Sequence, residues 1–355
     1  MEKCKEFLRR KNIIISAKRY LIDAMGAMAQ GLFASLLIGT IIGTLGTQLG
    51  IELLVTIGGY AKAAVGPAMA VAIGYALQAP PLVLFSLAAC GAAANELGGA
   101  GGPLAVLIVT IFAAELGKAV SKETKIDILV TPFVTVCVGA ALSMWWAPAI
   151  GTAASTLGGA IMWATELQPL FMGILVSVLV GIALTLPLPI SSAAICAALG
   201  LVGLAGGAAL AGCSAQMVGF AVLSFRENGW GGLVAQGVGT SMLQMGNIVK
   251  NPRIWLPVIL TSAVTGPLAT CVFGLEMNGA AISSGMGTCG FVGQIGVYTG
   301  WLSEIAAGSR AGIGAMDWIG LILISFVLPA ALTLLFGAFF RRIGWIREND
   351  LKLEL

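Results

Sequence analysis

The sequence has 355 residues and contains no histidine. A histidine nucleophile, a phosphohistidine, a histidine proton relay and a histidine metal site are therefore excluded within this chain. Its seven cysteines form no CxxC pair, and six of them lie in apolar stretches. Small buried residues are the simplest interpretation of these six cysteines. No disulfide, metal site or other cofactor is predicted.

Charge is also scarce. Only 10% of the residues are charged and 58% are hydrophobic, whereas a typical soluble domain carries about 25% charged residues. Apolar runs extend from Gly26 to Phe340, and glycine is abundant, with 49 residues. In a bilayer glycine allows helices to pack closely. The composition therefore predicts an all-α polytopic membrane protein.

More than half of the basic residues lie near the two ends of the sequence. The positive-inside rule places both ends in the cytoplasm, which requires an even number of crossings. No cleaved signal peptide is predicted, because no short apolar region stands apart from the later spans. The expected division is a basic cytoplasmic segment, a first membrane repeat, a second repeat, a glycine-rich segment with the last helix, and a cytoplasmic tail. Their ranges are 1–26, 27–149, 150–277, 278–340 and 341–355.

The apolar runs differ in length, and a full transmembrane helix needs about 20 residues. The runs that suit full-length helices are 27–48, 53–76, 128–149, 169–187, 190–211, 255–275 and 317–340. The stretch 279–300 is rich in Gly, Ser and Thr and is expected to be broken. Four runs are too short, namely 81–94, 103–117, 213–225 and 232–246. Together they predict about 10–12 transmembrane segments.

The short runs come in pairs, and each pair encloses a similar polar turn, at 95–102 and at 226–232. Later landmarks correspond as well, because Gly117 and Gly246 are 129 residues apart. This pattern predicts an internal repeat of five segments with two hairpins that resemble re-entrant loops. Because five is an odd number of crossings, the second repeat begins on the opposite side of the membrane from the first, which favours an inverted repeat. An inverted repeat would place the basic residues Lys250 and Arg253 outside the cytoplasm, against the positive-inside rule, so a parallel repeat is the alternative.

Discontinuous helices near the bilayer midplane are typical substrate sites of transporters. Helix N-termini and glycine backbone can approach a ligand there, and charged residues at membrane depth are usually functional. The two turns therefore place Asn95, Glu96, Glu227 and Asn228 at a candidate binding site. The alternative is that both turns are ordinary aqueous loops between short tilted helices.

A third polar cluster follows Gly274, and it contains Glu276, Asn278, Ser283 and Gln294. Such a stretch is too polar for a plain span, so it is a candidate for an unwound, site-lining segment that binds hydroxyl groups. The alternative is a helix interface built on small residues. The basic loop with Lys118, Lys122 and Lys125 is either a cytoplasmic topology loop or a docking surface for a soluble partner.

Two of these stretches, 117–132 and 276–294, resemble the membrane (EIIC) proteins of the phosphotransferase system, in the PfoR-like branch. The resemblance implies a bacterial inner-membrane permease, a homodimer, and a soluble IIB protein that phosphorylates the bound sugar. Permeases of the glucose type use Glu and His at the sugar site, and the His role has no counterpart in this sequence.

Three functions are weighed on these grounds. The first is a transporter for a sugar or polyol with an elevator-like mechanism, because the site residues suit an uncharged, hydroxyl-rich solute. The second is a membrane-bound sensor or regulator that binds a small molecule or a soluble partner without transport. The third, an intramembrane enzyme, has least support, because the sequence offers no nucleophile and base pair.

Overall fold

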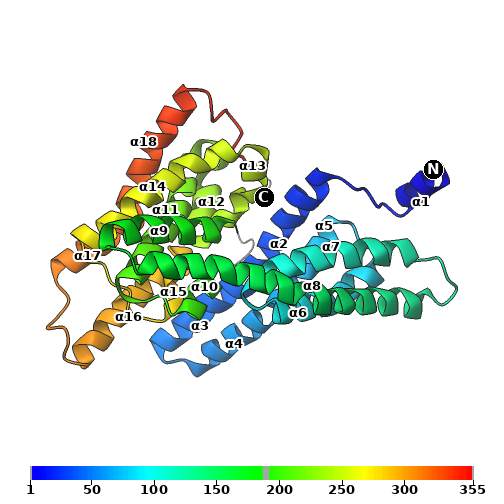
Figure 1. Ribbon diagram of the computed structural model, residues 1–355, viewed down its shortest axis with the longest axis horizontal. Coiled ribbons are helices and arrows are strands. Elements are labelled where there is room, and N and C mark those ends of the chain that lie inside the picture. The colour runs from blue at the N-terminus through cyan, green and yellow to red at the C-terminus, as the bar shows by residue number, and fades with distance from the viewer. Residues whose placement is uncertain (1, 187–191, 354–355) are drawn as a thin grey trace. The chain divides into compact units, whose positions relative to one another are not determined.

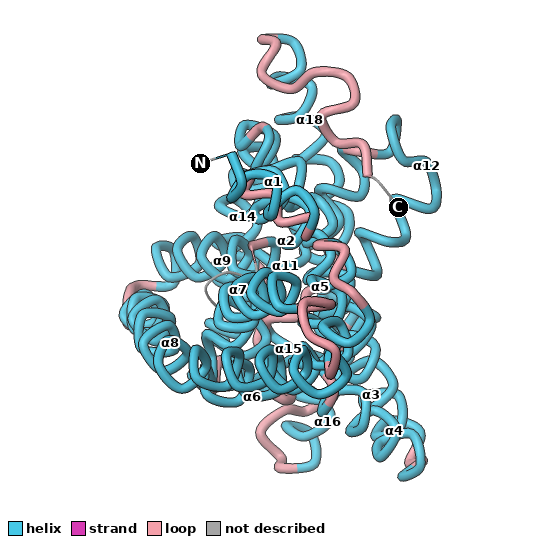
Figure 2. The backbone as a smooth tube through the Cα atoms, turned by 90° about the vertical axis from the view of Figure 1, so that its right-hand side faces the viewer, coloured by secondary structure: helices cyan, strands magenta, loops and turns pink. Residues whose placement is uncertain are grey.

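The computed structural model describes residues 2–186 and 192–353, and the chain divides into two compact units. The first unit ends at Ser155 and the second begins at Thr156. Helices and loops make up both units (Figures 1 and 2). Within the described ranges, the only strand-like pairing is an isolated bridge between Gly203 and Met277.

The first unit consists of eight helices in its described residues. Two π-helical turns, Lys18–Asp23 and Phe33–Leu37, join two of these helices into one continuous helix from Lys18 to Leu49. The helices are α1 (Glu2–Arg10), α2 (Ala24–Leu32), α3 (Ile38–Leu49), α4 (Glu52–Ala63), α5 (Val65–Ala76), α6 (Pro81–Gly98), α7 (Gly102–Val120) and α8 (Asp127–Thr165), which leads into the second unit.

Glycine sets how closely the helices of the first unit pack. A methyl group on Gly66 of α5 would lie 2.3 Å from the carbonyl oxygen of Gly91 on α6, and the reverse distance is also 2.3 Å. Real carbon atoms do not approach an oxygen that closely, so both positions require glycine. This contact shows how the glycine content serves helix packing in an apolar medium.

The second unit contains ten further α-helices in its described part. They are α9 (Pro169–Thr185), α10 (Ser192–Leu199), α11 (Gly203–Leu223), α12 (Phe225–Val234), α13 (Met245–Lys250), α14 (Leu256–Pro267), α15 (Ala281–Ser284), α16 (Val292–Ala306), α17 (Ala315–Ile322) and α18 (Leu328–Arg342). Helix α11 lies at the centre, packed against α9, α14 and α18. Short 3₁₀ or π-helical turns extend several of these helices.

Seven helices in the described residues are long and apolar enough to cross a membrane, or eight if the bent pair α4 and α5, at 49°, forms one span. The all-α membrane class is therefore confirmed, but the number of long apolar helices is below the expected 10–12 segments. Some of the expected segments, such as α9 with its 17 residues, are shorter than a full span.

Several predicted segment boundaries are wrong. The runs 81–94 and 103–117 were expected to be too short, but α6 and α7 have 18 and 19 residues, enough to span. The expected span 190–211 is interrupted at Gly200, whose φ of +59° ends α10. Helix α11 then includes most of the run 213–225, because the apolar pattern is continuous there and shows no break.

The stretch 279–300 is broken, as its composition predicted. It forms the short helix α15, a 3₁₀ turn at Cys289–Phe291 and then α16. Phe291 adopts a left-handed φ of +58° directly before α16.

The two ends of helix α11 in the second unit make different polar contacts. Helix α11 begins at Gly203, which pairs with Met277 beyond the end of α14. At the other end of α11, the carbonyl oxygen of Leu223 accepts a hydrogen bond from Arg341 near the end of α18. The first of these ends holds the pocket described next.

Candidate functional site

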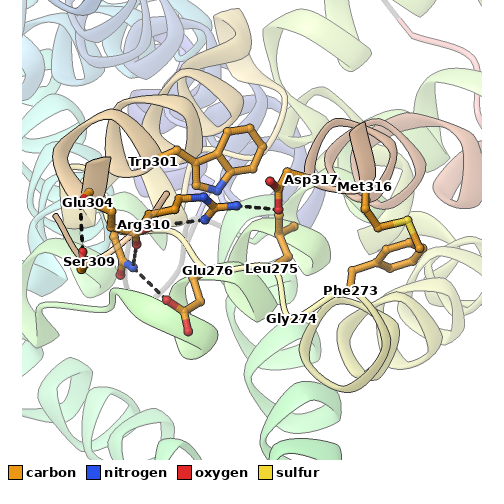
Figure 3. A pocket seen from close by; sticks show the side chains of 12 residues that line it. Phe273, Gly274, Leu275, Glu276, Trp301, Glu304, Ser309, Arg310, Met316 and Asp317 are labelled. Carbon is orange, nitrogen blue, oxygen red and sulfur yellow. Dashed lines mark hydrogen bonds and ion pairs between the residues drawn. The ribbon is translucent and has the colours of Figure 1, made fainter. Parts of the chain in front are cut away.

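A pocket of about 530 Å³ lies at the end of the second unit where α11 and α17 begin. Its volume falls in the range of about 300–1,000 Å³ typical of small-molecule sites. Figure 3 shows Arg310 between Glu304 and Asp317, with Glu276 across from them. The lining residues are Phe273, Gly274, Leu275, Glu276, Asn278, Trp301, Glu304, Ser309, Arg310, Met316, Asp317 and Gly320.

The segment after α14 leaves the helix at Gly274, which has a φ of +55°. Met277 then pairs with Gly203 through two backbone hydrogen bonds of 3.0 and 3.1 Å. Because successive side chains of an extended segment point in opposite directions, Met277 is buried while Glu276 is exposed to the pocket. The local backbone therefore presents Glu276 and Asn278 together.

The Asn278 side chain joins three parts of the site. Its Oδ1 accepts a hydrogen bond of 2.9 Å from the Gly203 amide, and its Nδ2 donates to Glu276 over 2.9 Å. The same Nδ2 also donates to Glu304 on α16. Asn278 thus fixes the start of α11 and orients two pocket carboxylates.

Arg310 lies in the loop between α16 and α17. Its guanidinium contacts Glu304 over 3.1 Å and Asp317 over 2.5 Å. It also lies 5.3 Å from the centre of the buried Trp301 ring, a cation–π distance. Because Arg310 covers this face, Trp301 supports the guanidinium and is not an open aromatic platform.

The pocket carries three carboxylates, Glu276, Glu304 and Asp317, against one cation, Arg310. The hydrogen bond from Arg310 to Asp317, with a further one to Glu304, raises the pKa of the guanidinium above its usual value. Arg310 therefore stays charged, and the remaining excess of negative charge disfavours an anionic ligand. Carboxylate acceptors beside guanidinium donors suit a neutral ligand rich in hydroxyl groups.

Ser283 and Gln294, the other predicted members of this cluster, do not line the pocket. Ser283 is buried against Gly296 on α16. Both amide atoms of Gln294 are buried and, among the described residues, have no hydrogen-bond partner. A ligand-binding role for these two residues stays a prediction.

The predicted turn at 226–232 lies within α12, which is interrupted at Gly229, and this region holds the C-terminal tail. Glu227 pairs with Arg341 over 2.8 Å, and its side chain is almost fully buried. Asn228 donates to the Leu351 carbonyl and accepts from the Leu353 amide, each over 2.8 Å. The structure therefore places Glu227 and Asn228 at the opposite end of α11 from Glu276 and Asn278.

The turn at 95–102 belongs to the first unit. Asn95 packs against Gly66 and Gly102, whereas Glu96 is exposed. Residues 95–98 complete α6, the chain turns at Gly99, whose φ is +50°, and α7 begins at Gly102. The role of Asn95 and Glu96 in substrate binding stays a prediction.

The predicted docking lysines differ in exposure. Lys118 is 1% exposed and its ammonium contacts Glu115 over 2.7 Å, with further hydrogen bonds to the carbonyls of Asn12 and Leu77. It cannot contact a soluble partner in this conformation, because it lies at the buried end of α7. Lys122 and Lys125 are exposed and remain candidates for docking.

Sequence reasoning missed Glu304, Arg310 and Asp317. These charges lie between two strongly apolar runs, a place where charged residues usually mark an aqueous loop. They lie in a different segment from Glu276, so no short helical spacing linked them with it. The sequence did contain one signal, because three charged residues lie in a short segment of a chain that has few charges.

No group of three His, Cys, Asp or Glu side chains in the described residues is arranged to hold a metal ion. Searches of curated proteins and of solved structures gave no match. The sequence profile of one family, described as "Phosphotransferase system, EIIC", matches residues 22–353.

Proposed function

Because the chain belongs to the EIIC family of the phosphotransferase system, and is thus a membrane component of sugar transport, we propose that it binds a sugar or polyol in the pocket at Glu276. The observation that supports this site is the convergence of Glu276 and Asn278 with Glu304, Arg310 and Asp317. These residues come from four separate segments of the second unit, namely the stretch after α14, α16, the loop after α16, and α17.

The mechanism we propose is selection by hydrogen bonding. Glu276 offers carboxylate oxygens to ligand hydroxyl donors, and Arg310 offers N–H groups to ligand oxygens. Asn278 positions Glu276 through its hydrogen bond. An analogue that lacks one hydroxyl group leaves a pocket group unpaired, so it binds more weakly.

Transport follows, in this proposal, from an elevator-like alternating-access motion. The division of the chain into two compact units supports the idea, because such a mechanism requires one body that moves relative to another. EIIC components work with a separate IIB protein, and the exposed Lys122 and Lys125 are its proposed docking residues. The homodimer, the PfoR-like branch and the cytoplasmic location of both ends stay predictions.

The test is substrate binding and uptake. The purified protein is screened for thermal stabilisation by neutral sugars and polyols, since a ligand that binds only the folded state raises the apparent melting temperature. We expect Glu276→Gln to lower the affinity for the responding compound about tenfold, which corresponds to one lost charge-assisted hydrogen bond. Glu166→Gln, at an exposed carboxylate outside the pocket, should leave the affinity unchanged.

Uptake into liposomes then separates transport from sensing. Uptake of the bound compound, reduced in Glu276→Gln, supports the permease. Binding without uptake, in the presence of a IIB protein and a phosphoryl donor, favours the sensor alternative. Equal affinities of Glu276→Gln and the unmodified protein would show that the pocket is not the sugar site.

A further inference from the structure

A second cavity, of about 370 Å³, lies in the first unit and has the opposite charge. It forms where the segment after α1, the end of α5 and the loop after α7 come together. Its lining residues are Arg10, Lys11, Asn12, Gln78, Pro80, Lys118, Ser121, Lys122 and Glu123. Four of them are cationic and one is anionic, and the proposed sugar site includes none of them.

The wider surroundings only partly reduce this positive charge. Behind the buried Lys118 lie Glu115 and Arg19, whose opposite charges cancel. Asp127 accepts a hydrogen bond from the Lys122 amide, and its negative charge offsets one unit of the positive charge of the cavity. The cavity region therefore keeps an excess of two positive charges.

Helix ends explain the two buried cations. The Leu77 carbonyl at the end of α5 accepts hydrogen bonds from both Arg19 and Lys118. Carbonyl groups at a helix C-terminus carry partial negative charge, which attracts cations. These two side chains therefore hold the walls of the cavity in place, and Arg10 and Lys122 remain exposed at its rim.

The cavity also concentrates unusual backbone. Asn12, Gln78 and Lys122 have φ values of +54°, +54° and +61°. They are three of the five non-glycine residues with positive φ in the described part of the chain, and all three line the cavity. Such conformations are uncommon outside glycine and cluster at ligand sites and switch regions.

The one anionic lining residue is already engaged. Glu123 accepts from Arg10 over 2.7 Å and from Lys11. The hydrogen bond from Lys11, together with the charge of Arg10, lowers the pKa of the Glu123 carboxyl, so it stays ionised at neutral pH. The Glu123 carboxylate thus occupies part of the cationic surface of the cavity. Arg10 still has N–H donors that do not contact Glu123.

We propose that this cavity is a binding site for a phosphate group, with Arg10 and Lys122 as the exposed ligands at its rim. The excess of two positive charges matches a phosphate dianion, and a guanidinium fork recognises phosphate oxygens well. The phosphate belongs either to a small soluble phosphate ester or to the headgroup of an anionic lipid.

The probe is inorganic phosphate, added to the full chain in detergent at matched ionic strength with chloride as reference. We expect phosphate to raise the apparent melting temperature more than chloride does. Arg10→Gln and Lys122→Gln should each weaken the apparent phosphate affinity roughly tenfold. Arg9→Gln is the matched control for Arg10→Gln, because Arg9 is exposed next to Arg10 but does not line the cavity.

Nanodiscs distinguish the two sources of phosphate. If phosphate stabilises the protein in nanodiscs of phosphatidylcholine but not of phosphatidylglycerol, an anionic lipid already fills the site. If phosphate stabilises it equally in both, the ligand is a soluble phosphate ester. The proposal is overturned if phosphate and chloride act alike in detergent, or if Arg9→Gln weakens the phosphate effect as much as Arg10→Gln. None of these readouts depends on sugar binding or uptake.

Discussion

The turns at 95–102 and 226–232 look alike in sequence but are built on different physical principles. The first is set by close packing, since Asn95 contacts Gly66 and Gly102. The second is set by polar side chains, since Glu227 pairs with Arg341 and Asn228 binds the tail. Similar short motifs thus acquire their structural role from what each unit packs against them.

The largest effect is expected where packing leaves no space. Gly66→Ala places a methyl group 2.3 Å from the Gly91 carbonyl oxygen, so we expect a loss of about 3 kcal/mol in the free energy of unfolding. Gly231→Ala is the matched change in the second turn, where a methyl group meets nothing within 4 Å. Thermal unfolding in detergent measures both variants. Equal losses would contradict the contrast between the turns.

A smaller effect is expected from removal of the amide that binds the tail. Asn228→Ala removes two hydrogen bonds to the backbone of residues 351 and 353, so it should destabilise the attached tail by about 1–2 kcal/mol. Asn95→Ala keeps the Cβ that packs against Gly66 and should change stability less. Limited proteolysis of the tail measures the release. A tail that stays protected in Asn228→Ala would show that its remaining contacts, which include the hydrogen bonds from Gln244 and Asn247, are enough to hold it.

The smallest effect on stability is expected at Glu96, whose side chain is exposed. Glu96→Gln should change the free energy of unfolding by no more than about 0.5 kcal/mol, as for most surface substitutions. The same variant tests the predicted role of Glu96 in substrate binding. Unchanged sugar uptake by Glu96→Gln would remove this residue from the site and leave the first turn with packing alone.

The sequence predicted the helical membrane class well, because scarcity of charge and long apolar runs are direct consequences of a lipid environment. It also predicted the break within 279–300, where glycine and hydroxyl residues weaken a helix. It did not predict the break at Gly200 or the full length of α6 and α7. Hydropathy records composition, whereas a helix end depends on the backbone angles of single residues.

The candidate site was predictable only where its residues are adjacent in sequence. Glu276 and Asn278 were identified together because they flank one buried residue in an unusual polar segment. Arg310 reaches them only through the fold, by its ion pair with Glu304. Lys118 shows the opposite error, since a lysine in a basic loop was expected at the surface, but helix-end carbonyls and Glu115 hold it inside.

The attachment of the tail has a consequence for how this region tolerates substitution. Asn228, Gln244 and Asn247 bind main-chain atoms of residues 351–353 rather than their side chains. Substitutions at Lys352 therefore leave these hydrogen bonds intact, whereas replacement of a single amide removes one or two of them. We therefore expect substitutions of the exposed Lys352 to leave the tail attached, and substitutions of any of the three amides to loosen it.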